Sequence, residues 1–337
     1  MRERYSRQEL FSGIGADGQR KLQKAEVVII GAGALGSSAA ETLVRAGVGS
    51  ITIIDRDYVE FSNLNRQQLY TENDAAGTIP KAAAAEKRLR EINSNITINA
   101  IIGEADIAFL ETVTTCDLII DALDNFETRM LVNDFCQKHN IPWIYGACIG
   151  SYGLTLTIRP GITPCLHCLM EDIPLDGETC DTAGIIAPAV QMVSAHQTTE
   201  AMKLLTGNLA ALRPTLFSFD LWKNEFSEVN VNGLRNSECP SCSEKAVYPY
   251  LDYSHWTKTE MMCGREAVQI RPAANQVLSL QDLKKRYQSF VQKENDHLLV
   301  LLLENKKVVI FSDGRVMIHG VNDKTKARQL YQMYIGG

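Results

Sequence analysis

The chain has 337 residues, enough for two domains, and its 45% hydrophobic and 22% charged content is that of a folded globular protein. A formal net charge of -6 argues against a nucleic-acid-binding function. The charged N-terminal segment MRERYSRQEL lacks the apolar core of a signal peptide, and no apolar run approaches the ~18 residues of a membrane helix. Composition therefore favours a cytoplasmic enzyme that binds neither nucleic acid nor a membrane.

Short apolar runs alternate with helical patterns up to about residue 150. Continuous apolar strands that alternate with helices are typical of a parallel sheet covered on both faces. We therefore expect an α/β fold with a Rossmann-like, doubly wound, mostly parallel sheet. The expected strands are 27–30, 51–55, 96–102, 117–123 and 142–147, and the helices between them are 35–47, 80–92 and 125–139.

The pattern changes after residue 150. Three runs, at 153–160, 216–221 and 225–231, predict antiparallel strands that extend the sheet, and 188–206 predicts a helix. The stretch 170–187 is the longest irregular segment in this part of the chain. Long loops in compact domains are usually functional or mobile.

The residues from 246 onward predict a small α+β domain. Its expected elements are a strand at QIRP, a helix over 279–292, a hairpin over 298–320 with a tight turn at 312–315, and a helix over 323–334. We therefore divide the chain into a domain of residues 1–245 and a C-terminal domain of residues 246–337, to which the sequence assigns no role.

A glycine-rich segment, GAGALG at 31–36, lies between a predicted strand and a predicted helix. Gly31 permits a tight turn, Gly33 lets the backbone approach a ligand, and Gly36 allows close packing of the helix on the strand. Asp55 ends the next strand, where a carboxylate can bind the ribose hydroxyls. The motif predicts a bound nucleotide but does not separate NAD from ATP; the alternative is that the glycines serve packing only.

Four polar residues further along the chain favour ATP. Asn65 and Arg66 follow Asp55, Lys81 begins a helix, and Asp124 follows the fourth strand. Arginine and lysine bind phosphate oxygens, and Mg²⁺ takes one or two carboxylates together with phosphates. Taken singly, Lys81 could be a solvated lysine, Arg66 a surface ion pair and Asp124 a helix N-cap. As an ordered set they predict a triphosphate with its magnesium.

Two CxxC pairs predict a structural Zn²⁺ site, because four thiolates complete a tetrahedral shell and leave no position open for substrate. The alternative is four free, reactive thiols. Most of the other cysteines are expected to be buried small hydrophobes. The pairs are Cys165/Cys168 and Cys239/Cys242, and the buried cysteines are Cys116, Cys136, Cys148 and Cys263.

The ordered motifs make the chain resemble the MoeB/ThiF family, relatives of ubiquitin-activating enzymes, and above all the ThiF members of Gram-positive bacteria. The resemblance spans roughly residues 3–245 and departs from the family at Ala34, where a glycine is frequent. It is carried by YSRQ (5–8), GAGALG (31–36), SNLNRQ (62–67), Lys81, DNFETR (124–129), TPCLHC (163–168), TCDTAGIIAPAV (179–190) and CPSC (239–242).

The resemblance implies an adenylyltransferase that uses MgATP. Its substrate would be the C-terminal Gly-Gly tail of a ubiquitin-like sulfur carrier, for thiazole synthesis or, as the alternative, molybdopterin synthesis. It implies that Asp55 holds the ribose, that Asn65, Arg66 and Lys81 hold the phosphates, and that Asp124 holds Mg²⁺. The ATP-binding residues would be Gly31, Gly33, Ala34, Gly36, Asp55, Ser62, Asn63, Leu64, Asn65, Arg66, Lys81, Asp124 and Asn125.

Two further expectations come from the same resemblance. Arg7 would reach the ATP phosphates of the other protomer in a homodimer. Cys180, in the long loop, would link covalently to the activated carrier or be dispensable, with a cysteine desulfurase as a further sulfur-donating partner. Two readings of other classes stay open: an NAD(P)-dependent oxidoreductase, and a zinc-stabilised binding scaffold without catalysis.

Overall fold

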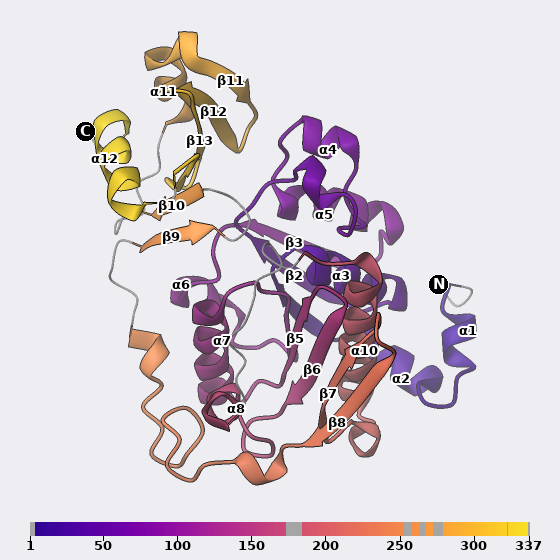
Figure 1. Cartoon of the computed structure of the whole chain (residues 1–337). Helices are drawn as coiled ribbons and strands as arrows, with labels where there is room; N and C mark the ends of the chain where they lie inside the picture. The colour runs from indigo at the N-terminus through magenta and orange to yellow at the C-terminus, as the bar shows by residue number, and fades with distance from the viewer. Residues whose placement is uncertain are drawn as a thin grey trace. The chain divides into compact units, whose positions relative to one another are not determined.

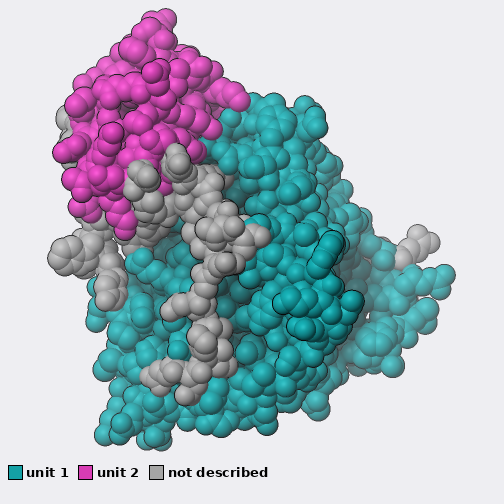
Figure 2. Space-filling view, viewed as in Figure 1, with its two compact units in different colours: residues 1–252 teal, residues 253–337 magenta. Residues whose placement is uncertain are grey.

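The computed structural model describes residues 4–172, 184–252, 258–262, 267–271, 279–321 and 323–335. The chain forms two compact units, residues 1–252 and 253–337 (Figure 2). The first unit extends past residue 245 because Tyr250 and Leu251 pack on its core. The backbone N–H of Tyr250 also donates to the Asp134 carboxylate at 2.9 Å.

An eight-stranded sheet forms the centre of the first unit (Figure 1). Its strands lie in the order β3-β2-β1-β4-β5-β6-β7-β8. β1 to β5 pair in parallel, and β6, β7 and β8 extend the sheet in antiparallel fashion. The expected fold class is confirmed. The bounds are β1 Glu26–Ile30, β2 Ser50–Asp55, β3 Thr97–Ile102, β4 Leu118–Asp121, β5 Trp143–Ile149, β6 Tyr152–Ile158, β7 Thr215–Asp220 and β8 Glu225–Asn230.

Helices cover both faces of this sheet, as the apolar strands require. Successive side chains of a strand point to opposite faces, so Val27 and Ile29 enter one core while Val28 and Ile30 enter the other. The first core includes α3 (Ala34–Ala46), α5 (Lys81–Ile92) and α10 (Ala187–Thr206). The second includes α6 (Ile107–Leu110), α7 (Phe126–His139) and α8 (Leu166–Asp172).

Shorter helices complete the first unit. Two of its long helices, α3 and α10, end at a glycine. α3 stops at Gly47 and α10 at Gly207, both in the left-handed conformation, with φ of 85° and 84°. The short elements are α1 (Ser6–Glu9), α2 (Gly15–Leu22), α4 (Glu72–Ala76) and the 3-10 helices Phe61–Asn63, Glu111–Val113, Leu209–Ala211, Asn232–Leu234 and Pro249–Asp252.

The second unit is a six-stranded antiparallel sheet in the order β11-β12-β13-β14-β10-β9, with two helices. The expected turn at 312–315 joins β13 to β14, and Glu304 and Asn305, both with positive φ, form the turn before β13. The bounds are β9 Lys258–Met262, β10 Ala267–Arg271, α11 Leu280–Arg286, β11 Val291–Glu294, β12 Leu298–Leu303, β13 Lys306–Phe311, β14 Val316–His319 and α12 Lys324–Tyr334.

One predicted helix was wrong in its second half. Residues 279–292 were expected to be helical, but α11 ends at Arg286 and a 3-10 helix, Gln288–Phe290, follows it. Val291 then starts β11, which pairs with the strongly apolar β12. Strand pairing with LLVLLL therefore overrides the local helical pattern.

None of the helices in the described ranges has the length and apolar character that a membrane span requires.

Candidate functional site

The site lies at the switch point of the large sheet. The chain leaves β1 toward β2 and β3 on one side, whereas β4 and β5 follow on the other side. Ligands of open α/β sheets bind at the carboxyl ends of the strands at such a point. The glycine segment follows β1 and Asp124 follows β4, and Ala122 lies against both Gly31 and Gly36. The topology thus brings together two motifs that lie far apart in the sequence.

Each glycine of GAGALG meets a different environment. Gly31 has a φ of 100°, which only glycine adopts readily. A Cβ on Gly36 would lie 1.9 Å from the Gly31 carbonyl oxygen, so Gly36 lets α3 pack on the end of β1. A Cβ on Gly33 would meet nothing nearer than the Gln67 amide nitrogen at 3.9 Å. The backbone at Gly33 is therefore the open face, which a phosphate chain can approach.

Ala34, where the family frequently has glycine, begins α3. Its side chain packs with Leu35 and Val193 in a small apolar cluster. The extra methyl group is therefore accommodated by the protein interior.

Asp55 is bound to the glycine segment. Its Oδ2 accepts a hydrogen bond from the Ala32 N–H, and its Oδ1 accepts one from the Asp57 N–H, both at 2.6 Å. Burial raises the pKa of the Asp55 carboxyl, and the positive charge of Lys81 opposes that rise. Each carboxylate oxygen keeps a lone pair for a further donor, such as a ribose hydroxyl.

Tyr70 is a site residue that sequence reasoning missed. It is buried, and its hydroxyl donates to the Ala32 carbonyl at 2.5 Å, on the same residue whose N–H binds Asp55. Burial and the nearby carboxylates Asp55, Asp74 and Asp57 raise its pKa well above the ordinary value, so the hydroxyl keeps its proton. The sequence feature that could have indicated this role is an aromatic residue shortly after SNLNRQ.

Lys81 is a buried cation. Its backbone N–H donates to the Asp57 carbonyl at 2.8 Å, and its Nζ forms an ion pair with Asp57 Oδ2 at 3.2 Å. Only 5% of the residue is exposed, so the alternative of a solvated lysine at a helix start was wrong. Asp57 is a second residue that sequence reasoning missed, although it lies two positions from Asp55.

The SNLNR segment, residues 62–66, forms a tight turn that ends at Arg66. One terminal nitrogen of Arg66 donates to the Ser62 carbonyl at 2.9 Å and to the Asn65 side-chain oxygen at 3.0 Å. Neither partner is a carboxylate, so the alternative of a surface ion pair has no support among the described residues. Asn63 is buried and caps its own turn by accepting from the Glu60 N–H at 3.1 Å, while Leu64 packs on the core. Asn65 is exposed and Arg66 is half-buried, so these two side chains, unlike Asn63 and Leu64, are not taken up by the protein interior.

Asp124 and Asn125 follow β4, and their side chains have different environments. Asn125 is the N-cap of α7, since its side-chain oxygen accepts from the Thr128 N–H at 2.9 Å. The alternative of Asp124 as that cap was therefore wrong. The Asp124 carboxylate is exposed, and its one described hydrogen bond is a long contact of 3.4 Å from the Asn125 amide. An exposed carboxylate at the strand end is suited to a divalent cation.

Arg129, in α7, holds this loop in place. Its Nε donates to Asp121 at 3.0 Å, and one terminal nitrogen donates to the carbonyls of Leu123 at 2.6 Å and Gly146 at 3.0 Å. Burial raises the pKa of the Asp121 carboxyl, and the guanidinium opposes that rise. Sequence reasoning gave Arg129 no role. The sequence feature that could have indicated a buried ion pair is an arginine among the apolar residues of the predicted helix.

Two predicted residues are not brought to this edge by the described structure. Arg7 is exposed on α1, and α1 is joined to the far end of α3 by a hydrogen bond from Gln8 to the Ala46 carbonyl at 2.8 Å. Cys180 lies outside the described residues. The chain after it returns to the carboxyl edge of the sheet, where the Gly150 N–H donates to the Gly184 carbonyl at 2.8 Å.

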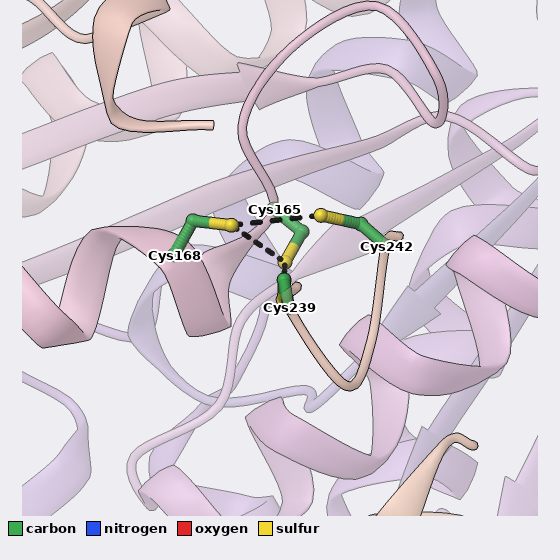
Figure 3. Close-up of side chains that lie close together, drawn as sticks. All are labelled: Cys165, Cys168, Cys239 and Cys242. Atoms are coloured by element: carbon green, nitrogen blue, oxygen red, sulfur yellow. Dashed lines mark hydrogen bonds between the residues drawn. The ribbon is translucent and has the colours of Figure 1, made fainter. Parts of the chain in front are cut away.

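The four cysteines of the CxxC pairs converge (Figure 3). The Sγ–Sγ distances are 3.8 Å for Cys165–Cys168, 3.6 Å for Cys165–Cys239 and 3.5 Å for Cys168–Cys242. A tetrahedral Zn²⁺ with bonds of about 2.3 Å holds its sulfurs about 3.8 Å apart, so the cluster fits this ion. The Asn236 N–H also donates to Cys168 Sγ at 3.5 Å, and the Ser241 N–H to Cys239 Sγ at 3.4 Å.

The other cysteines are unlike these four. Cys116 and Cys136 are buried, Cys148 is half-buried, and Cys263 lies outside the described residues. Burial raises the pKa of the Cys116 thiol to about 12 and that of Cys136 well above its ordinary value. Both therefore stay protonated and inert, as expected.

Replacement of one cysteine of the cluster should remove zinc and stability together. We expect Cys239→Ser to lose its equivalent of zinc and to lower the free energy of unfolding by roughly 3 kcal/mol or more, about 10 °C in melting temperature. Metal analysis and thermal unfolding measure both effects. Cys148→Ser, outside the cluster, should keep its zinc; unchanged stability in zinc-free Cys239→Ser would contradict a structural role.

Gly33 and Gly36 should separate ligand binding from packing. We expect Gly36→Ala to lower the free energy of unfolding by about 3 kcal/mol, because its Cβ would overlap the Gly31 carbonyl. Gly33→Ala should lower that energy by only about 1 kcal/mol, because Gly33 is the N-cap of α3, but weaken ATP binding about tenfold, because its methyl group stands on the open face. Urea unfolding and ATP titration test the pair; equal effects of the two variants on both measurements would contradict this division.

Known proteins resemble this chain over most of its length. It is 52% identical over 339 residues to the sulfur carrier protein ThiS adenylyltransferase of Bacillus subtilis (strain 168), covering 100% of both chains. It is 34% identical over 245 residues to the molybdopterin-synthase adenylyltransferase of Escherichia coli (strain K12), covering 72% of this chain and 96% of that protein. The crystal structure of E. coli MccB with ATP matches with a TM-score of 0.62 at 25% identity, over 71% of this chain and 74% of that one.

The ThiF family model matches residues 5–241, a range that contains the glycine segment, the SNLNR turn, Lys81, Asp124 and three of the four clustered cysteines. With the fold, the order of these motifs and the full-length relative in agreement, the chain belongs to the ThiF family.

Proposed function

We propose that the chain catalyses the ATP-dependent adenylation of the C-terminal glycine of a ThiS-like sulfur carrier, for thiazole synthesis. The observation that carries the proposal is the 52% identity to a ThiS adenylyltransferase over the whole of both chains. That match includes the C-terminal unit, whereas the match to the molybdopterin-synthase adenylyltransferase covers 72% of this chain. Adenylation of a MoaD-like carrier remains the alternative.

In this reaction an oxygen of the carrier's terminal carboxylate forms a bond to the α-phosphorus of ATP. The bond from that phosphorus to the bridging oxygen of the β-phosphate breaks, and pyrophosphate leaves. The products are an acyl-adenylate and pyrophosphate. Charge accumulates on the transferring phosphate and the leaving group, so positioned cations and N–H donors stabilise the transition state.

The described contacts support a distribution of roles at the carboxyl edge. Asp55 would accept from the ribose hydroxyls while the Ala32 and Asp57 N–H groups hold its carboxylate still. The open backbone at Gly33 would receive the phosphates, and Asn65, Arg66 and Lys81 would bind their oxygens. Asp124 would hold Mg²⁺, which neutralises phosphate charge when it is bound.

Arg7 is best explained as a residue that acts on a second protomer. α1 is attached to the C-terminal end of α3, while the glycine segment is at the N-terminal end. α3 has 13 residues and is therefore about 20 Å long. One chain keeps Arg7 away from its own glycine segment, and a homodimer would bring it to the ATP phosphates of the partner.

The carrier's identity is tested by a competition between two substrates. With α-phosphate-labelled ATP, we expect a ThiS-like carrier to be adenylated at least about tenfold more efficiently, in kcat/KM, than a MoaD-like carrier. A ThiS-like carrier that lacks its terminal glycine is the matched control and should not react. The opposite preference would move the chain to the molybdopterin pathway, and binding of NADH without carrier adenylation would support an oxidoreductase.

Cys180 is proposed to receive the activated carrier. Its thiolate would attack the acyl-adenylate carbonyl and displace AMP, giving a thioester. A Cys180 persulfide supplied by a cysteine desulfurase would attack in the same way and give an acyl disulfide. A thiol reductant would then cleave its S–S bond, which releases the carrier thiocarboxylate and the Cys180 thiol. We expect Cys180→Ala to release pyrophosphate at the normal rate but to form carrier thiocarboxylate at least about tenfold more slowly. Mass spectrometry of the carrier measures this, and full thiocarboxylate formation would show that Cys180 is dispensable.

A further inference from the structure

Asp57 and Lys81 form a little-exposed ion pair next to the proposed ribose-binding carboxylate. The side chains of Lys81 and Asp57 are 7% and 16% exposed, and their charged atoms lie 3.2 Å apart. The same residues share a backbone hydrogen bond of 2.8 Å, from the Lys81 N–H to the Asp57 carbonyl. Two independent contacts therefore fix the start of α5 against the end of β2.

The Asp57 main chain also takes part in the site. Its N–H donates to Asp55 Oδ1 at 2.6 Å, so residue 57 is joined to the carboxylate on one side and to the lysine on the other. A side-chain substitution at 57 leaves both backbone bonds in place. It removes the negative charge that faces the ammonium group and that also acts on Asp55 and Tyr70.

We propose that Asp57 is a positioning residue that holds the Lys81 ammonium group at the site of the ATP phosphates, an inference that rests on the proposed function. A buried ammonium group is costly without a counter-charge. Lysine is also a flexible chain with three donors and no fixed geometry. One donor bound by Asp57 fixes the position of the nitrogen and leaves two donors for phosphate oxygens.

A neighbouring ion pair provides a matched control. Arg56 and Glu104 also lie 3.2 Å apart, with side chains 17% and 9% exposed. Glu104→Gln removes one carboxylate charge near the end of β2 and leaves Asp57, the partner of Lys81, unchanged. A general effect of lost negative charge near β2 would therefore appear in both Asp57→Asn and Glu104→Gln.

Binding of ATP and of adenosine, each titrated with Mg²⁺ and without carrier, tests the proposal. Adenosine has no phosphate, so it reads the ribose and base contacts alone. We expect Asp57→Asn to weaken ATP binding about tenfold and adenosine binding less than about twofold, with Glu104→Gln unchanged for both. Equal weakening of both ligands by Asp57→Asn, or the same loss in Glu104→Gln, would overturn the proposal.

A double-mutant cycle with Lys81→Met makes the test independent of folding. In the Lys81→Met background, Asp57→Asn should weaken ATP binding by less than about a further twofold, because its partner is already gone. If Asp57→Asn alone is too unstable to bind nucleotide, the double variant removes both charges and should regain adenosine binding; its failure to do so would overturn the proposal. If ATP and adenosine binding change in the variants as expected, but the protein does not adenylate a carrier, only the proposed function is refuted.

Discussion

The buried ion pair between Arg129 and Asp121 is the contact on which the carboxyl edge of the sheet depends. Arg129 joins Asp121, the Leu123 carbonyl and the Gly146 carbonyl, and so fixes the ends of β4 and β5 relative to each other. Gln197 of α10 adds hydrogen bonds to the Asp121 and Ile144 carbonyls from the other face of the sheet. Because both charges are buried, loss of either partner would leave an uncompensated ion, which is strongly destabilising.

The same helix, α7, also organises the opposite end of the molecule's first unit. Its Asn133 accepts from the Leu166 N–H at 2.8 Å, at the start of α8, and its Asp134 accepts from the Tyr250 N–H at 2.9 Å. Leu166 lies between Cys165 and Cys168, and Tyr250 follows Cys242 in the chain. Since Ile158 pairs with Trp143 at the beginning of β5, the cluster follows the amino edge of the parallel strands, while the proposed nucleotide site is at the carboxyl edge. α7 therefore connects a structural site with a chemical one.

Much of the fold and part of the site could be predicted from local sequence. The glycine segment, the apolar strands and the CxxC spacing are signals read within a few residues. Asp57, Tyr70 and Arg129 were missed because their importance lies in partners that only the fold supplies: Lys81, the Ala32 carbonyl and Asp121. The predicted length of the α11 helix was wrong for the same reason, because β11 forms by pairing with β12. Side-chain placement by long-range contacts is what a single sequence does not reveal.

The cysteine cluster is also a cross-link of the chain. A metal bound to Cys168 and Cys239 would close a loop of about 70 residues, which contains α10 and the strands β7 and β8. Closing a loop of that length removes about 4 kcal/mol of conformational entropy from the unfolded chain, if a metal bridge acts as a covalent one does. The bridge would then stabilise the folded first unit without touching β7 or β8, because it restricts the conformations that the unfolded chain can adopt.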